Sequence, residues 1–137
     1  MLGERPANMV CGLRVLLVED EFMVALLLET MLTDLGYQVV GPVARLEKGL
    51  EMVEQEAIDL AVLDVNINGR EVYPIAEALE ARGIPFIFAT GYGSTGLHPA
   101  YSGRPVLQKP YRREHLRVAI EGACDQSRNQ MKAPGFA

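Results

Sequence analysis

Four segments of the sequence end in side chains that could act on a metal ion or a phosphoryl group. These side chains are the acidic run Glu19, Asp20 and Glu21, then Asp64, Thr90 and Lys109, each directly after an apolar stretch. Converging carboxylates repel one another unless a cation is present, and their oxygens suit Mg²⁺. A carboxylate beside Mg²⁺ is a nucleophile toward phosphorus, while a hydroxyl and an ammonium can neutralise oxygens of a transferring phosphoryl group. These residue types predict a Mg²⁺-dependent site that forms an aspartyl phosphate.

Asp64 is the residue around which this site would be organised. It ends the run Ile58-Asp59-Leu60-Ala61-Val62-Leu63, which is typical of a buried strand, and Asn66, Asn68 and Gly69 follow as a loop. Taken alone, an Asp in this place is most often the start of a turn or a helix cap. A buried strand has no use for a charge, however, so its last residue should open onto a crevice.

Strands and helices alternate along the whole sequence. Strands are predicted at residues 13–21, 37–43 (closed by Gly41-Pro42), 58–64, 84–90 and 104–110, and helices at 22–36, 44–57, 71–83 and 113–123. The stretch 91–105 is rich in Gly and Pro, so any helix there should be short or mobile. Nearly continuous apolar strands favour an α/β fold, a doubly wound parallel sheet covered on both faces, with ligands gathering at the carboxyl ends of its strands.

Length and composition indicate one domain without nucleic-acid or membrane partners. The 137 residues fit one core, with residues 1–12 as a flexible leader and 125–137 as a polar tail. A net charge of −5 argues against binding to a phosphate backbone. No signal peptide or membrane-spanning run appears, so we expect a cytoplasmic protein. Cys11 and Cys124 match no metal or redox spacing and are interpreted as reduced thiols.

Four motifs together resemble the receiver domain of two-component response regulators over residues 13–124. They are VEDE (18–21), VLDVNING (62–69), FATGYG (88–93) and QKPY (108–111). The resemblance implies a CheY-like, flavodoxin-like sheet of order 2-1-3-4-5. It also implies these roles: Asp64 as phosphoacceptor, Asp20 as a direct Mg²⁺ ligand, Glu19 acting on the metal through water, Asn66 offering its backbone carbonyl, Thr90 and Lys109 contacting the phosphoryl group, and Gly91 leaving room for it.

FATGYG also resembles the Phe-Ala-Thr-Gly-hydrophobic-Tyr motif of single-domain regulators in alphaproteobacteria, with Gly93 in place of the closing Tyr. That subgroup implies a kinase of the HWE or HisKA2 type. Most receivers have an aromatic switch residue three positions before the Lys, where this chain has Val106. Tyr92 and Tyr101 could substitute for it, although a Tyr in such a loop more often lies on the surface.

Three function classes follow from this pattern. The first is a stand-alone receiver that accepts a phosphoryl group on Asp64 from a histidine kinase or a phosphotransfer protein. It would signal, or drain phosphate, by binding an unknown downstream protein as a monomer or weak homodimer, and would catalyse only its own phosphorylation and dephosphorylation. The second is a pseudo-receiver that binds partners without phosphorylation. The third is a phosphohydrolase, which would need a further general acid near Asp64 that Asn66 does not supply.

Overall fold

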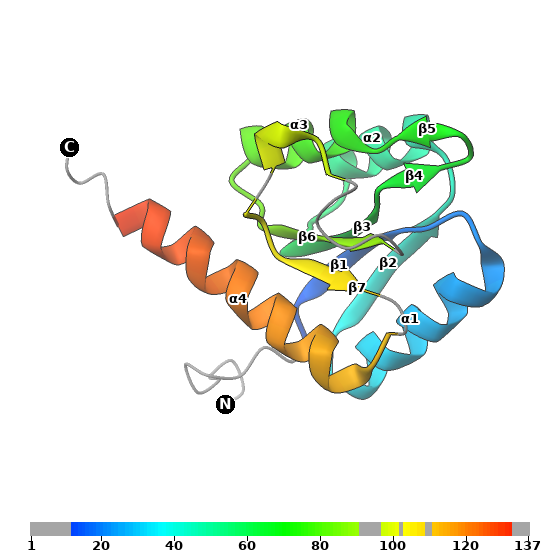
Figure 1. The fold of residues 1–137 in the computed structure, drawn as a ribbon, viewed down its shortest axis with the longest axis horizontal. Helices are drawn as coiled ribbons and strands as arrows, with labels where there is room; N and C mark the ends of the chain where they lie inside the picture. The colour runs from blue at the N-terminus through cyan, green and yellow to red at the C-terminus, as the bar shows by residue number, and fades with distance from the viewer. Residues whose placement is uncertain (1–11, 91–96, 102, 109–110, 133–137) are drawn as a thin grey trace.

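The fold is a three-layer sandwich with a parallel sheet between two pairs of helices (Figure 1). The computed structural model describes residues 12–90, 97–101, 103–108 and 111–132, with side chains up to residue 125. Its elements are β1 (Arg14–Val18), α1 (Phe22–Asp34), β2 (Gln38–Val43), α2 (Leu46–Gln55), β3 (Leu60–Asp64), β4 (Asn66–Ile67), β5 (Arg70–Glu71), α3 (Tyr73–Ala81), β6 (Phe86–Thr90), a 3₁₀ helix (Pro99–Tyr101), β7 (Val106–Gln108) and α4 (Arg113–Lys132). The predicted alternation of strands and helices is confirmed.

The large sheet has the strand order β2-β1-β3-β6-β7, and all of its pairs are parallel. This is the predicted order 2-1-3-4-5, because β4 and β5 form a separate hairpin between β3 and α3. The flavodoxin-like fold is therefore confirmed. The carboxyl ends of β1, β3 and β6 lie side by side, since Val18 pairs with Leu63 and Asp64 pairs with Ala89.

Successive side chains of each central strand point to opposite faces of the sheet, so each strand contributes to two separate hydrophobic cores. On one face, Leu16 and Leu63 pack with α2 and α3, whose Val53 and Ile75 are fully or almost fully buried. The other core joins strand residues to α1 and α4, and its members include Val15, Val62, Leu28, Leu116 and Ile120. Burial on both faces explains why these strands appear as uninterrupted apolar runs in the sequence.

The second strand, predicted over residues 37–43, is present as Gln38–Val43 and contains Gly41-Pro42 near its end. The pairing with β1 shifts register between Leu16 and Val18, which marks a β-bulge. Gly41 has φ +101°, and a Cβ there would lie 2.9 Å from the Val43 nitrogen, so a side chain would not fit. Beyond the bulge, the Val43 carbonyl accepts a hydrogen bond from the Glu19 N–H at 2.9 Å. The end of β2 thereby fixes the backbone of a predicted site residue.

The last helix is longer than predicted, because residues 125–132 continue α4 rather than begin the tail. No Pro or Gly interrupts the sequence between Gly122 and Pro134. Arg117 also bridges one turn in each direction, pairing with Glu114 and, at 2.9 Å, with Glu121. In Figure 1 the second half of α4 projects beyond the sheet. Polar composition was therefore a poor guide to where the helix ends.

Several predictions fall outside the described residues. They concern Gly91, Lys109, Tyr92, Cys11 and most of the leader 1–12 and the end of the tail. In the described part of the segment 91–105, the predicted short helix is present as the 3₁₀ helix Pro99–Tyr101. None of the described helices is both long and apolar enough to cross a membrane.

Candidate functional site

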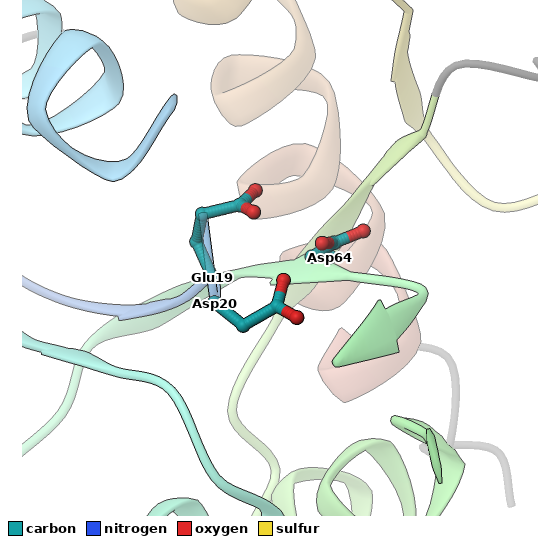
Figure 2. Close-up of side chains that lie close together, drawn as sticks. All are labelled: Glu19, Asp20 and Asp64. Atoms are coloured by element: carbon teal, nitrogen blue, oxygen red, sulfur yellow. The ribbon is translucent and has the colours of Figure 1, made fainter. Parts of the chain in front are cut away.

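Three predicted carboxylates meet at the carboxyl ends of β1 and β3 (Figure 2). Glu19 and Asp20 follow β1, and Asp64 is the last residue of β3. Because Val18 and Leu63 are paired neighbours, the residues that follow them are brought to the same point of the sheet edge. One carboxylate oxygen from each of the three side chains lies within 4.8 Å of the others.

Glu19 is the buried member of this acidic cluster, with 3% of its surface exposed. Burial and the nearby carboxylates of Asp64 and Asp20 raise its pKa to about 8, although a hydrogen bond from the Glu21 backbone N–H acts in the opposite direction. That N–H donates to Oε2 of Glu19 at 3.1 Å. The Glu19 carboxyl therefore holds a proton near neutral pH when no cation is bound.

Asp20 and Asp64 are more open to solvent, and each accepts a hydrogen bond from the hairpin that follows β3. The Asn68 backbone N–H donates to Asp20 Oδ2 at 2.7 Å, and the Asn66 backbone N–H lies 3.4 Å from Asp64 Oδ1. Asn66 begins β4, two residues after Asp64. Asn66 therefore lies beside Asp64, and the metal contact predicted for its backbone carbonyl stays a prediction; the sequence analysis gave no role to Asn68.

Thr90 lies on the strand next to Asp64. It ends β6, one residue after Ala89, which pairs with Asp64, and only 5% of its surface is exposed. A hydroxyl and the carboxylate cluster therefore occupy adjacent strand ends, as the sequence predicted. The other two predicted contacts, from Gly91 and Lys109, lie outside the described residues.

The donor set of the cluster fits Mg²⁺. All three side chains present oxygen, which hard divalent cations prefer. Burial is the main cause of the raised pKa of Glu19, and the charges of Asp64 and Asp20 add to it, so a cation would relieve both. Mg²⁺ commonly binds through one or two carboxylates and keeps several waters. Half-buried Asp64 and exposed Asp20 beside buried Glu19 leave an open side for those waters.

Tyr111 is a site neighbour that the sequence analysis did not single out. Burial and then the negative charges of Glu19 and Asp64 raise the pKa of its phenol, so the ring lies close to the acidic cluster. Its side chain is 8% exposed and packs with the core beneath α1 and α4. The only sequence signal was its place directly after Lys109-Pro110.

Tyr101 is buried, which contradicts the expectation that a Tyr in this segment lies on the surface. Its ring stacks on Tyr73 with centroids 5.3 Å apart and meets the edge of Phe88 at 5.5 Å. Val106, the position without the usual aromatic, is paired with Phe88 and packs against the same core. Tyr101 and Val106 thus belong to the same core as Phe88, a grouping that the local sequence could not reveal.

Comparison with known proteins gives the family. The model of the response regulator receiver domain matches residues 15–121. The chain belongs to this family. Receiver domains are signalling domains of two-component systems rather than classical enzymes, and they interact with histidine kinases or phosphotransfer proteins.

Solved structures similar to this receiver include SdrG from Sphingomonas melonis Fr1. It is 40% identical with a TM-score of 0.77, and the match covers 85% of this chain and 99% of that one. SdrG has also been solved in a BeF3-activated conformation. The receiver domain of the sensor histidine kinase PA1611 from Pseudomonas aeruginosa PAO1 was solved with a magnesium ion coordinated in its active site cleft. It is 26% identical with a TM-score of 0.71, over 82% of this chain and 98% of that one.

A curated relative is the transcriptional regulatory protein PdtaR of Mycobacterium tuberculosis (strain CDC 1551 / Oshkosh). It is 29% identical over 84% of this chain and 58% of its own length. This receiver therefore spans a little over half of that relative, and the likeness concerns the receiver part alone.

Proposed function

We propose that this receiver accepts a phosphoryl group on Asp64 in a Mg²⁺-dependent reaction and then acts by binding another protein. The single observation behind the proposal is that Glu19, Asp20 and Asp64 place one oxygen each within 4.8 Å at the ends of β1 and β3. The buried Thr90 on the adjacent strand end adds a hydroxyl beside them. The signal could pass onward, or the domain could serve as a phosphate sink for its kinase.

The residues divide the reaction between them. A carboxylate oxygen of Asp64 attacks phosphorus, the bond to the donor histidine nitrogen breaks, and that nitrogen keeps the electron pair. Asp20, Asp64 and the Asn66 backbone carbonyl would hold Mg²⁺, with Glu19 acting through a bound water. When bound, the ion supplies positive charge for the phosphoryl oxygens. The Thr90 hydroxyl and the Lys109 ammonium would bind the remaining phosphoryl oxygens, and the absence of a side chain at Gly91 would leave space for the group.

The test is to incubate the protein with acetyl phosphate and Mg²⁺ and measure its intact mass. We expect a gain of one phosphoryl group that disappears when EDTA is added. If the folded protein shows no gain, incubation with beryllofluoride asks whether the pocket holds the phosphoryl shape. Failure to bind beryllofluoride as well would contradict the proposal and favour a pseudo-receiver. Continuous turnover of a phosphate ester would instead favour a phosphohydrolase.

The phosphate donor is proposed to be a histidine kinase of the HWE or HisKA2 type, or a phosphotransfer protein. The resemblance of FATGYG to the motif of single-domain regulators supports this choice. The receiver itself is proposed to be a monomer or a weak homodimer. The exposed start of α1 offers a surface for such a partner. Phe22, Met23, Leu26 and Leu27 are 75%, 70%, 46% and 44% exposed, and they begin directly after Glu21 at the edge of the site. Large apolar side chains in one exposed group commonly mark a protein contact.

Replacing Leu26 and Leu27 together by Glu should affect phosphorylation by a protein donor but not phosphorylation by the small molecule acetyl phosphate. Phosphotransfer from the protein donor is expected to slow by about tenfold, because an apolar contact is lost and charge is introduced. Labelling by acetyl phosphate, which needs no docking surface, should keep its wild-type rate. Thr33→Glu, which adds a charge at the exposed far end of the same helix, is the matched control. Equal slowing with both donors would place the defect in the site rather than in docking.

A further inference from the structure

The hairpin after Asp64 is built into the site rather than being a connecting loop. β4 and β5 pair antiparallel, with Ile67 opposite Arg70, and Asn68-Gly69 forms the two-residue turn between them. Both turn residues have positive φ, +54° and +82°, as the tight hairpin turns that favour Asn-Gly require. Among the described residues, Asn68 is the one non-glycine residue with a positive φ.

This conformation points a backbone donor at the acidic cluster. The Asn68 N–H donates to Asp20 Oδ2 at 2.7 Å, across a separation of 48 residues in the sequence. Asp20 is exposed, so nothing in its own burial fixes its carboxylate. A hydrogen bond to Oδ2 orients the Asp20 carboxylate, which also has an oxygen within 4.8 Å of oxygens of Glu19 and Asp64.

The hairpin is itself held firmly in place. Ile67 is fully buried in the core beneath α2 and α3, and the Val72 N–H donates to the Val65 carbonyl at 2.9 Å where the hairpin returns. The Arg70 guanidinium pairs with Glu47 on α2. The position of the Asn68 N–H is therefore supported by contacts of the hairpin other than the one with Asp20, chiefly the burial of Ile67.

We infer that the Asn68-Gly69 turn is a positioning element of the metal site, which presets the Asp20 carboxylate for the cation through the Asn68 backbone N–H. The inference rests on the proposed function, because it concerns the Mg²⁺ that the acidic cluster would hold. Asn68 is not proposed to contact the phosphoryl group or the metal ion. It acts through Asp20, and its side chain matters only because Asn tolerates the positive φ that β-branched residues avoid.

Direct Mg²⁺ titration by calorimetry, together with thermal unfolding in EDTA, tests the inference. Asn68→Val disfavours the positive φ and should weaken the Kd for Mg²⁺ by about 10- to 100-fold, the usual effect of losing a group that orients a metal ligand. Asn68→Gly keeps both the N–H and the conformation and should bind Mg²⁺ close to the wild-type Kd. If Asn68→Val does not fold, Gly69→Ala strains the same turn, where an added methyl group meets no atom within 4 Å.

Gly83→Ala is the matched control. Gly83 also has a positive φ, +70°, with no atom within 4 Å of an added Cβ, but it lies in the turn before β6 at the other end of the sheet. It should lower the EDTA melting temperature as the site variants do while leaving the Mg²⁺ Kd unchanged. An unchanged Kd in Asn68→Val, or an equal loss in Asn68→Gly or in Gly83→Ala, would overturn the inference alone. A wild-type protein that binds no Mg²⁺ would overturn the proposed function as well.

Discussion

Asp64→Asn is expected to abolish phosphorylation by acetyl phosphate and Mg²⁺, with no phosphoryl mass gained at any incubation time. An amide oxygen is a far weaker nucleophile than a carboxylate and cannot give a stable acyl phosphate, so the chemical step itself is lost. Intact-mass spectrometry of wild type and variant under the same conditions measures the result. Circular dichroism of both proteins verifies that the variant is folded.

The matched control for this change is Asp59→Asn, near the start of the same strand. Asp59 Oδ2 accepts a hydrogen bond from the Arg14 N–H at 2.8 Å, and an Asn oxygen can replace it. This control should label at the wild-type rate, because its carboxylate lies at the opposite end of β3. Persistent labelling of Asp64→Asn would show that another residue accepts the phosphoryl group and would contradict the assignment.

The titration of Glu19 should make the stability of the metal-free protein depend strongly on pH between about pH 5 and about pH 8. The folded protein holds this proton up to a pKa of about 8, whereas the unfolded chain releases it near 4.5. Between these values the folded state binds more protons, so the stability of the metal-free protein should fall as pH rises and the buried carboxylate ionises. Melting temperatures in EDTA across this range measure the effect.

Mg²⁺ binding should show the opposite dependence. Each pH unit below about 8 should weaken the apparent affinity by about tenfold, because the ion has to displace the Glu19 proton. Calorimetry near neutral pH in buffers of different ionisation enthalpy should report one proton released per ion. Glu19→Gln should remove both pH dependences, because a Gln side chain does not ionise. PH-independent binding by the wild type would contradict the coupling.

The residue pattern was sufficient to predict the parallel sheet and the acidic part of the site, whereas the strand order came from the resemblance to receiver domains. Apolar strands that end in polar groups are strong signals, because two-sided burial forbids charge everywhere except at the strand ends. Glu19, Asp20 and Asp64 therefore came together as predicted, and Thr90 lies on the adjacent strand end. Their individual roles in phosphorylation remain proposals.

Contacts between residues far apart in the sequence were not predictable. Tyr101 is buried because the rings of Tyr73 on α3 and Phe88 on β6 pack against it, and the sequence around Tyr101 does not indicate these contacts. The role of Asn68 depends on a backbone N–H that meets Asp20, a contact that leaves no trace in residue type. Helix α4 continues to Lys132, past the apolar positions on which the predicted end of the helix was based, and its polar last turns gave no signal of this in the sequence.

The bulge at Gly41-Pro42 also protects the protein against strand-to-strand aggregation. β2 is an outer strand of the sheet, and outer strands expose unpaired backbone groups that can recruit another chain. Pro42 has no N–H to offer, and the bulge bends the strand away from the flat shape that such pairing needs. The opposite outer strand, β7, has 3 residues in the part of the chain that the structure describes. The bulge that places the Val43 carbonyl against the Glu19 N–H therefore also makes β2 a poor pairing partner for another chain, and the short β7 does the same at the other edge of the sheet.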